Sequence, residues 1–256
     1  MLFVAGSIFN ASDLIHEFSE QSVQGKLLYT MSGSRISYRY DNVHQLKFEL
    51  SLRNAIVDAS VALQRSGLRF AKFINSFCNQ TYWRRTPEGG FLLKENAAPS
   101  DAIFDIYHNG NKYGIECSTA IMILYYGALL DIYGKDLFNR TFPRIYLMNW
   151  KIQEPLLMEA GKSIKGQEAL YGDRQYFANP DVSSRNPEWQ GENVIVLPNS
   201  LYYGHGTGIR SAGEIMQKLN STRRWGARQS AYLMDVVARP DFKKLGEVYL
   251  GMVTFG

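Results

Sequence analysis

An almost unbroken apolar run over residues 117–133 sets the framework for the whole chain. Apolar residues surround a helix drawn through this segment instead of forming a stripe on one face, and such a helix is buried on all sides. A brief strand-like stretch over residues 112–115 comes directly before it. We therefore expect a central helix covered by the rest of the chain, with a cysteine in its first turn.

The other segments predict helices and strands in irregular alternation. Residues 43–63 repeat apolar side chains near a 3.6-residue period and predict a long helix. Residues 82–85 and 91–94 flank a Pro- and Gly-containing turn and predict a hairpin. The further expected elements are a short helix from an N-cap at Ser100 to Asn109, strands over residues 145–150 and 194–197, a loop over residues 179–193, a glycine-rich turn over residues 203–208, and a helix that a capping box of Ser211 and Glu214 begins. With no repeat and no linker in 256 residues, the sequence predicts one α+β domain over residues 1–256.

The composition excludes several classes of protein. It is 45% apolar and 20% charged, as in soluble globular proteins, and two cysteines cannot make a disulfide framework. Residues 1–10 have no basic start and their apolar run is interrupted, so we expect no signal peptide, no membrane span and a cytoplasmic location. The net charge of +4 equals the excess over residues 210–247, where eight basic and four acidic residues give 8 − 4 = +4. No groove-reading motif, metal-ligand spacing or calcium loop accompanies it, so we expect no nucleic acid, metal or cofactor.

Cys117 is the candidate nucleophile. A cysteine in the first turn of a helix faces unpaired backbone N–H groups and the positive end of the helix dipole. Both favour the thiolate, lower the pKa of the thiol and can hold an oxyanion during acyl transfer. The alternative is an inert, buried thiol. Cys78 lacks this setting, and we expect it to be structural.

Either a histidine or a carboxylate could serve as the base for Cys117. His205 lies in a glycine-rich turn, 205 − 117 = 88 residues after the cysteine, and an ordinary imidazole is only about 2 pKa units below an ordinary thiol. Glu116 is next to the cysteine in sequence, and Glu192 stands where a polar loop meets a strand. An ordinary carboxylate is about 4 units too acidic, although burial narrows that gap. The residues alone favour His205.

Several distinctive motifs follow one another along the chain. They are FELSLR at residues 48–53, YWR at 82–84 with PEG at 87–89, ECSTAI at 116–121, WQGENV at 189–194, HG at 205–206, LNS at 219–221 and QSAYL at 229–233. In order and spacing they are similar to the calcium-independent spore-coat transglutaminases of Bacillus and its relatives. The resemblance covers about residues 1–235, and the tail after about 235 does not match.

The resemblance implies a papain-like core related to the NlpC/P60 peptidases. It places the nucleophile at Cys117, its partner at Glu192 and a partly substituting acid at Glu116, with His205 left as an accessory residue. It also implies a substrate tunnel lined by Trp150 and Trp189. Asn149 precedes the first of these tryptophans where relatives are expected to have Asp, which counts against a carboxylate role there.

The implied activity is the cross-linking of proteins in the spore coat, after synthesis in the cytoplasm of the sporulating cell. Glutamine side chains would react through a cysteine thioester with lysine amines of other spore-coat proteins. One alternative is an NlpC/P60-like cysteine hydrolase that uses Cys117 and His205. The other is a non-catalytic coat protein with an inert cysteine.

Overall fold

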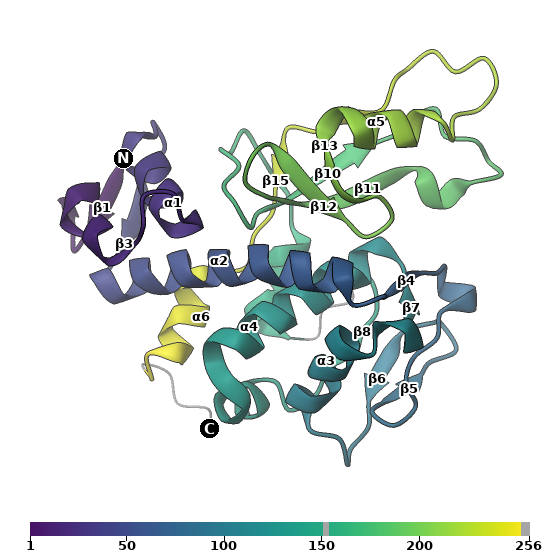
Figure 1. Cartoon of the computed structure of the whole chain (residues 1–256), viewed down its shortest axis with the longest axis horizontal. Helices are drawn as coiled ribbons and strands as arrows, with labels where there is room; N and C mark the ends of the chain where they lie inside the picture. Colours follow the sequence, from purple (N-terminus) through teal and green to yellow (C-terminus); the bar gives the residue numbers. More distant parts are fainter. Residues whose placement is uncertain (151–153, 252–256) are drawn as a thin grey trace.

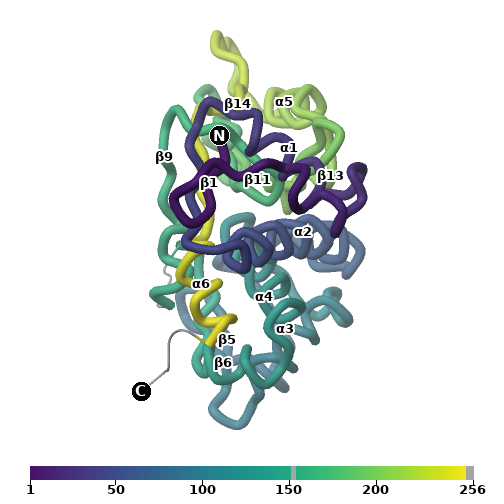
Figure 2. Tube along the Cα trace, turned by 90° about the vertical axis from the view of Figure 1, so that its left-hand side faces the viewer, coloured from purple at the N-terminus to yellow at the C-terminus, as the bar shows by residue number. Residues whose placement is uncertain are grey.

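Two long helices, α2 (Val43–Arg65) and α4 (Cys117–Thr141), cross the middle of the molecule and pack against each other (Figures 1 and 2). The structure is a computed structural model that describes residues 1–150 and 154–251. Helix α4 has buried residues on every side, which confirms the buried helix expected over residues 117–133. It continues to Thr141 through a kink at Gly134, where φ is 69° and a glycine avoids the strain of the left-handed region.

The remaining helices and the strands are short. The helices are α1 (Val23–Gly33), α3 (Pro99–His108), α5 (Ala212–Asn220) and α6 (Phe242–Tyr249). The strands are β1 (Leu2–Val4), β2 (Ser7–Ile8), β3 (Tyr38–Tyr40), β4 (Arg69–Phe70), β5 (Trp83–Arg85), β6 (Phe91–Leu93), β7 (Gly114–Ile115), β8 (Tyr146–Leu147), β9 (Ile164–Lys165), β10 (Arg174–Ala178), β11 (Gly191–Val196), β12 (Leu201–Gly204), β13 (Gly208–Ser211), β14 (Tyr232–Leu233) and β15 (Val236–Val237). The described chain is thus a mixed helix and sheet domain.

The largest sheet has five strands in the order β13-β12-β11-β10-β14, and all its pairings are antiparallel. Helix α5 lies on one face, above the sheet in Figure 1, and α4 packs against β11 from the other. Because successive strand residues point to opposite faces, Val194 packs with Ile215 of α5, whereas Ile195 joins the central core. Every second residue of β11, counted from Ile195, therefore faces α4.

A buried arginine ties α2 to distant parts of the chain. Arg53 is fully buried, and its guanidinium makes ion pairs of 2.8 Å with Glu49 and with Asp173. It also lies over the ring of Phe242 of α6, 4.4 Å from the centroid. Since a buried charge is stable only when it is paired, Arg53 holds together α2, the approach to β10 and the C-terminal helix.

The segment after residue 235 is part of the core. The Tyr133 hydroxyl of α4 donates to the carbonyl of Leu245 in α6 at 2.7 Å. The rings of Phe48 and Tyr249 lie 5.3 Å apart. Figures 1 and 2 show α6 beside α2, although the two helices are far apart in sequence.

The structure confirms most local predictions. The long helix, the hairpin β5–β6 and the capping box that begins α5 are present, and both bonds of the capping box form. Ser100 is not an N-cap, because Pro99 with its preset φ begins the helix after Ala98, and the backbone N–H of Ser100 instead donates to the side chain of Asn139 at 2.8 Å.

Three strand and loop boundaries were predicted wrongly. Only Tyr146–Leu147 pairs within residues 145–150, because the chain turns at Asn149, where φ is 50°. The expected loop over residues 179–193 ends early, because β11 begins at Gly191. The expected turn over residues 203–208 contains the ends of two paired strands, β12 and β13, and only residues 205–207 form the turn.

Candidate active site

Cys117 is the first residue of α4, and Glu116 caps that helix. The Glu116 carboxylate accepts hydrogen bonds from the backbone N–H groups of Ser118 and Thr119, both at 2.6 Å, and from the Thr119 hydroxyl. Glutamate is not a usual N-cap residue. Here it occupies the N–H groups that the sequence analysis had assigned to the sulfur or an oxyanion.

The expected lowering of the thiol pKa is therefore wrong. Burial, followed by the negative charges of Glu192 and Glu116, raises the pKa of Cys117 to about 12. Burial raises the pKa of Cys78 to about 11, and its sulfur is 4.0 Å from the carbonyl of Trp83, as expected of a structural cysteine. Both thiols are therefore protonated at neutral pH. A nucleophilic Cys117 needs other groups to remove its proton and to stabilise the negative charge of the thiolate.

Cys117 opens onto a cavity of about 430 Å³. Its lining comes from the start of α4, the segment after β8 and the adjoining edges of β10 and β11. The side chains that matter here are those of Glu116, Cys117, Asn149, Trp150, Arg174 and Asn193. Four of the residues proposed from the sequence, Cys117, Glu116, Asn149 and Trp150, thus share one cavity.

Asn149 fixes the segment beside the cysteine. Its backbone N–H donates to the Thr119 hydroxyl at 2.8 Å, and its side-chain oxygen is 2.7 Å from the Ser118 hydroxyl. Its φ of 50° lies in the left-handed region, which asparagine tolerates better than most residues. Asn149 therefore positions Trp150, whose ring lies under the guanidinium of Arg174 at 4.5 Å.

Glu192 lies on β11, behind this cavity. It is 1% exposed, and its Oε1 atom accepts a hydrogen bond from the backbone N–H of Gly206 at 2.8 Å. A side chain at Gly206 would come within 3.0 Å of Glu192 Oε2 and 3.3 Å of the Trp189 ring, so only glycine lets the turn approach so closely. Burial, with a smaller contribution from Glu116, raises the pKa of Glu192 to about 8.

No hydrogen bond joins the Glu192 carboxyl to the Cys117 sulfur in the described part of the chain. Its charge nevertheless acts on the thiol, as the raised pKa of Cys117 records. A carboxyl group with a pKa near 8 is close to the range in which general bases work at neutral pH. The structure thus places a buried carboxyl group close enough for its charge to act on the buried thiol, without a hydrogen bond between them.

Trp189 and His205 lie on the other side of Glu192. The Trp189 ring stacks on Phe70 at 5.9 Å. The Nε2 atom of His205 is 3.2 Å from the carbonyl of Arg69, and burial lowers the pKa of the imidazole. His205 lines a second cavity of about 450 Å³ that contains neither Cys117 nor Glu192. The structure does not bring His205 to the sulfur.

Two residues that the sequence analysis did not single out touch this site. The Asn193 side-chain N–H group donates to the Cys117 sulfur at 3.6 Å, and Arg174 Nη1 donates to the Asn193 side-chain oxygen at 2.9 Å. Asn193 lies two residues before Ile195, so strand alternation places both on the face of β11 that meets α4, and its place in the WQGENV motif was the available signal. Arg174 carried no comparable signal.

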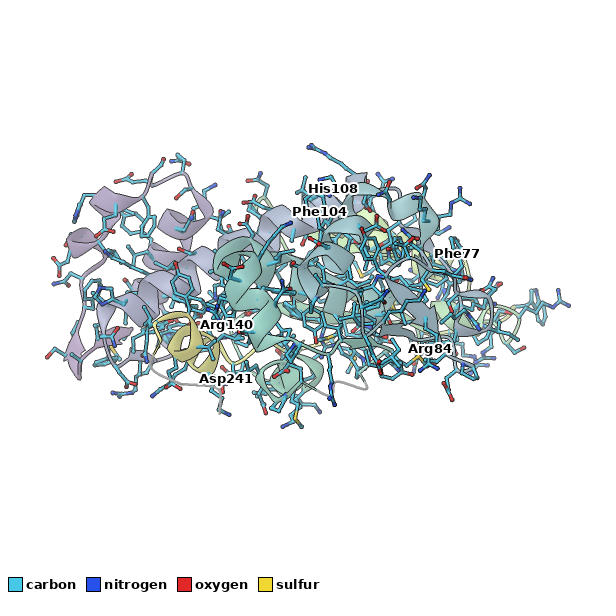
Figure 3. All side chains as sticks on the ribbon, turned by 90° about the horizontal axis from the view of Figure 1, so that it is seen from below. Phe77, Arg84, Phe104, His108, Arg140 and Asp241 are labelled. Atoms are coloured by element: carbon cyan, nitrogen blue, oxygen red, sulfur yellow. The ribbon has the colours of Figure 1, made fainter. Side chains whose placement is uncertain are left out.

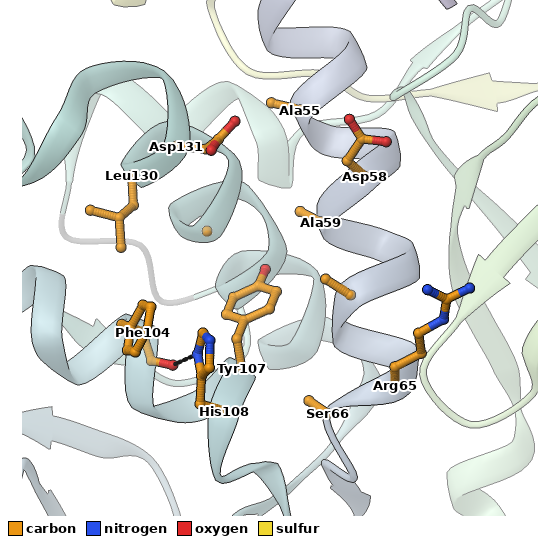
Figure 4. A pocket seen from close by; sticks show the side chains of 12 residues that line it. Ala55, Asp58, Ala59, Arg65, Ser66, Phe104, Tyr107, His108, Leu130 and Asp131 are labelled. Carbon is orange, nitrogen blue, oxygen red and sulfur yellow. Dashed lines mark hydrogen bonds between the residues drawn. The ribbon is translucent and has the colours of Figure 1, made fainter.

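A further cavity, of about 640 Å³, is a groove between α2, α3 and α4 (Figure 4). Phe104 and His108 stack at its rim with ring centroids 3.6 Å apart, and both lie at the surface in Figure 3. The His108 Nδ1 atom is 2.9 Å from the Phe104 carbonyl. The groove holds no cysteine, so the chemistry points to the smaller cavity at Cys117.

The side-chain clusters and helices of residues 1–150 and 154–251 bear on cofactors and membranes. No group of three or more His, Cys, Asp and Glu side chains there is arranged to hold a metal ion. Helix α4 is long and apolar enough to span a membrane by length and composition, but it is the buried core helix described above.

Comparison with known proteins identifies the family. The family model described as protein-glutamine gamma-glutamyltransferase matches residues 1–249. The chain belongs to the protein-glutamine gamma-glutamyltransferase family. The match to the family model runs past residue 235 and includes α6, the C-terminal helix that packs on α2.

Individual relatives agree with this assignment. A protein-glutamine gamma-glutamyltransferase of Bacillus subtilis (strain 168) is 41% identical over 246 residues, which cover 96% of this chain and 98% of the relative. One of Bacillus cereus (strain AH820) is 42% identical over 216 residues, covering 84% and 77%. The solved transglutaminase from Geobacillus stearothermophilus, without its C-terminal extension, is 42% identical with a TM-score of 0.76, and the match covers 81% of this chain and 98% of that one.

Membership in this family makes the chain an acyl-transferring enzyme. A cysteine that faces a cavity is a candidate nucleophile for such a reaction. Of the two cysteines, Cys117 opens onto a polar cavity, whereas Cys78 is packed against the core. The interpretation as a non-catalytic coat protein with an inert thiol is thereby disfavoured.

Proposed function

We propose that this transglutaminase joins glutamine side chains to lysine amines through a thioester on Cys117. The observation that carries the proposal is the placement of Cys117 at the start of α4, open to a cavity and under the influence of the buried Glu192 carboxyl. We also propose that the core is papain-like, because a cysteine at a helix start facing an antiparallel sheet is the arrangement that such enzymes use.

In the first half of the proposed reaction, the Cys117 sulfur attacks the carbon of a glutamine γ-carboxamide. The S–H proton passes to the ionised Glu192 carboxylate, and the S–C bond forms while the carbonyl electron pair moves to oxygen. When that pair returns, the C–N bond breaks and the nitrogen leaves as ammonia with a proton from Glu192. In the second half, a lysine amine attacks the thioester, Glu192 takes the amine proton, the S–C bond breaks and an isopeptide bond remains.

The pKa values set the cost of the first proton transfer. The pKa of Cys117, about 12, lies above that of Glu192, about 8, so the transfer from the thiol to the carboxylate is uphill by a few kcal/mol. A turnover of about 10 per second corresponds to a total barrier near 16 kcal/mol, so this step fits within it. Moving the proton to Glu192 also removes the negative charge that opposes the thiolate.

Because no hydrogen bond joins Glu192 to the sulfur, we propose that the proton passes through one bridging water or after a small rotation of the Glu192 side chain. Glu116 is adjacent, but its carboxylate is committed to the start of α4. We therefore assign Glu116 a substituting role only when Glu192 is lost.

Two tryptophans would protect the thioester from water. Trp150 lines the cavity at Cys117, and Trp189 packs beside Glu192 on the opposite side. Aromatic walls exclude water and guide the alkyl part of a lysine side chain. We propose that acceptor and donor chains approach Cys117 along a tunnel between these residues, and that His205 and Asn149 have accessory, positioning roles.

We propose spore-coat proteins with accessible glutamine and lysine side chains as substrates. The enzyme would be made in the cytoplasm of the sporulating cell and then act in the coat, without calcium, nucleic acid or membrane. The similarity to relatives from Bacillus supports this proposal.

The test is incorporation of a fluorescent amine into a glutamine-bearing protein, with and without EDTA. We expect equal incorporation in both arms and none with Cys117→Ala. Ammonia release without amine incorporation would instead favour the hydrolase, and incorporation by Cys117→Ala would exclude a thioester at this residue.

A further inference from the structure

Arg174 is a buried cation without an anionic partner. It is 4% exposed, yet within residues 1–150 and 154–251 no carboxylate lies at ion-pair distance from its guanidinium, whereas Arg53 and Arg239 both pair with Asp173. A buried charge is costly unless it is paired. Tyr125 and Cys117 are the ionisable side chains that act on its charge, and of these only Cys117 lines the same cavity, where it becomes negative as a thiolate.

The guanidinium is held in one orientation. Its Nε atom donates to the carbonyl of Ala160 at 3.2 Å, and Nη2 donates to the carbonyl of Gly161 at 3.4 Å and the hydroxyl of Ser163 at 3.0 Å. These contacts leave Nη1 aimed at the side-chain oxygen of Asn193, 2.9 Å away. A planar guanidinium fixed in this way imposes its orientation on what it binds.

Asn193 passes that orientation to the sulfur. Once Arg174 binds its oxygen, the amide can present only its N–H side to Cys117, where Nδ2 lies 3.6 Å from the sulfur. Asn193 is 6% exposed, so its amide meets the sulfur away from solvent. A side-chain donor therefore reaches Cys117 from β11, while the N–H groups of Ser118 and Thr119 at the start of α4 are occupied by Glu116.

We infer that Asn193, oriented by Arg174, supplies the donor that stabilises the Cys117 thiolate and then the oxyanion on the glutamine carbonyl. Asn193 touches the reacting sulfur and is a catalytic residue in this scheme, whereas Arg174 is a positioning residue that adds its positive charge. The thiolate part of the inference stands on geometry alone. The oxyanion part rests on the proposed function.

The test begins with Asn193→Asp in a Cys78→Ser background, which leaves one thiol. Aspartate has nearly the same shape and gives Arg174 an ion-pair partner, but an ionised carboxylate cannot donate to sulfur. Losing a hydrogen bond to a charged group slows iodoacetamide alkylation of Cys117 at fixed pH by about 10- to 100-fold. Losing an oxyanion donor lowers kcat by about 10²- to 10³-fold, with little change in KM.

The stability of the variant separates a catalytic from a structural role. We expect the urea midpoint of Asn193→Asp to equal or exceed that of the parent, because Arg174 gains a counter-ion. Asn111→Asp is the matched control, since it makes the same substitution at an exposed position that does not line the Cys117 cavity. It should alkylate and turn over within about twofold of the parent, well inside the effect of a lost charged hydrogen bond.

Unchanged alkylation in a folded Asn193→Asp protein would overturn the thiolate part. Slowed alkylation with an unchanged kcat would overturn the oxyanion part. If Asn193→Asp does not fold, Arg174→Lys takes its place, because lysine keeps the charge but cannot hold Ser163 and Asn193 in one plane. Parental alkylation by that variant would overturn the positioning role. Alkylation needs no substrate, so these results stand even if the cross-linking activity is not found.

Discussion

Replacing Glu192 with glutamine should stabilise the protein in alkaline solution and reduce its activity to the residual level that Glu116 can support. Glu192 is 1% exposed, and its pKa of about 8 lies well above the ordinary value of 4.5. In the unfolded chain the carboxyl ionises near its ordinary pKa, whereas in the folded chain it keeps its proton until about pH 8. Between these values the folded state binds more protons, so stability falls as pH rises.

The shift gives the size of the effect. A difference of 8 − 4.5 = 3.5 units, at 1.36 kcal/mol for each, corresponds to a destabilisation of roughly 5 kcal/mol. This destabilisation is absent below about pH 4.5 and complete above about pH 8. Glutamine carries no charge, and its carbonyl oxygen can keep the hydrogen bond from Gly206. Glu192→Gln should therefore match the wild type near pH 5 and exceed it by several kcal/mol at pH 9.

The assay is urea denaturation of both proteins at pH 5, 7 and 9, with amine incorporation measured alongside. Glu95→Gln is the control, because Glu95 is exposed and its replacement should leave the pH profile unchanged. An equal difference in the free energy of unfolding between wild type and Glu192→Gln at pH 5 and pH 9 would refute the reasoning. It would show that burial does not raise the pKa of the Glu192 carboxyl in the folded chain.

Three further predictions concern the thiol, the histidine and the core. In a Cys78→Ser background, alkylation of Cys117 should keep rising from pH 7 to pH 10 without a plateau near neutrality, because burial raises the pKa of the thiol to about 12; a plateau near pH 7 would contradict this. His205→Ala should keep amine incorporation within about tenfold, less than the loss expected for a general base, because its ring bonds the backbone and no hydrogen bond joins it to the Cys117 sulfur in the described residues; complete loss would restore the cysteine–histidine alternative. Arg53→Met should cost about 3–5 kcal/mol in urea denaturation by leaving the buried Glu49 without an ion pair and Asp173 with Arg239 alone, and a loss under about 1 kcal/mol would show that the pairs contribute little.

Features set by local sequence were predicted well. The capping box of α5 and the hairpin β5–β6 depend on residues close together in the chain, and both form as expected. The β12–β13 hairpin was missed because the glycines around His205 predict a turn but do not reveal how far the pairing of its flanks extends. Pairing between strands depends on contacts that no local pattern contains.

At the active site, the residue types were predictable but their electrostatics were not. The position of Cys117 in the first turn of a helix predicted a lowered thiol pKa. The opposite shift arises because Glu116, an unusual N-cap, takes the free N–H groups and adds a negative charge. Arg174 was invisible in the sequence, since its significance comes from the absence of an ion-pair partner in the described fold.

The covalent intermediate gives the most direct test of the account. The enzyme is mixed with a glutamine peptide without amine, quenched in acid and analysed by intact-mass and peptide-mapping mass spectrometry. The account predicts an adduct on Cys117 equal to the peptide less ammonia, which disappears when an amine is added and is absent from Cys117→Ala. An adduct on another residue, or amine incorporation through an enzyme that never carries the peptide, would contradict it.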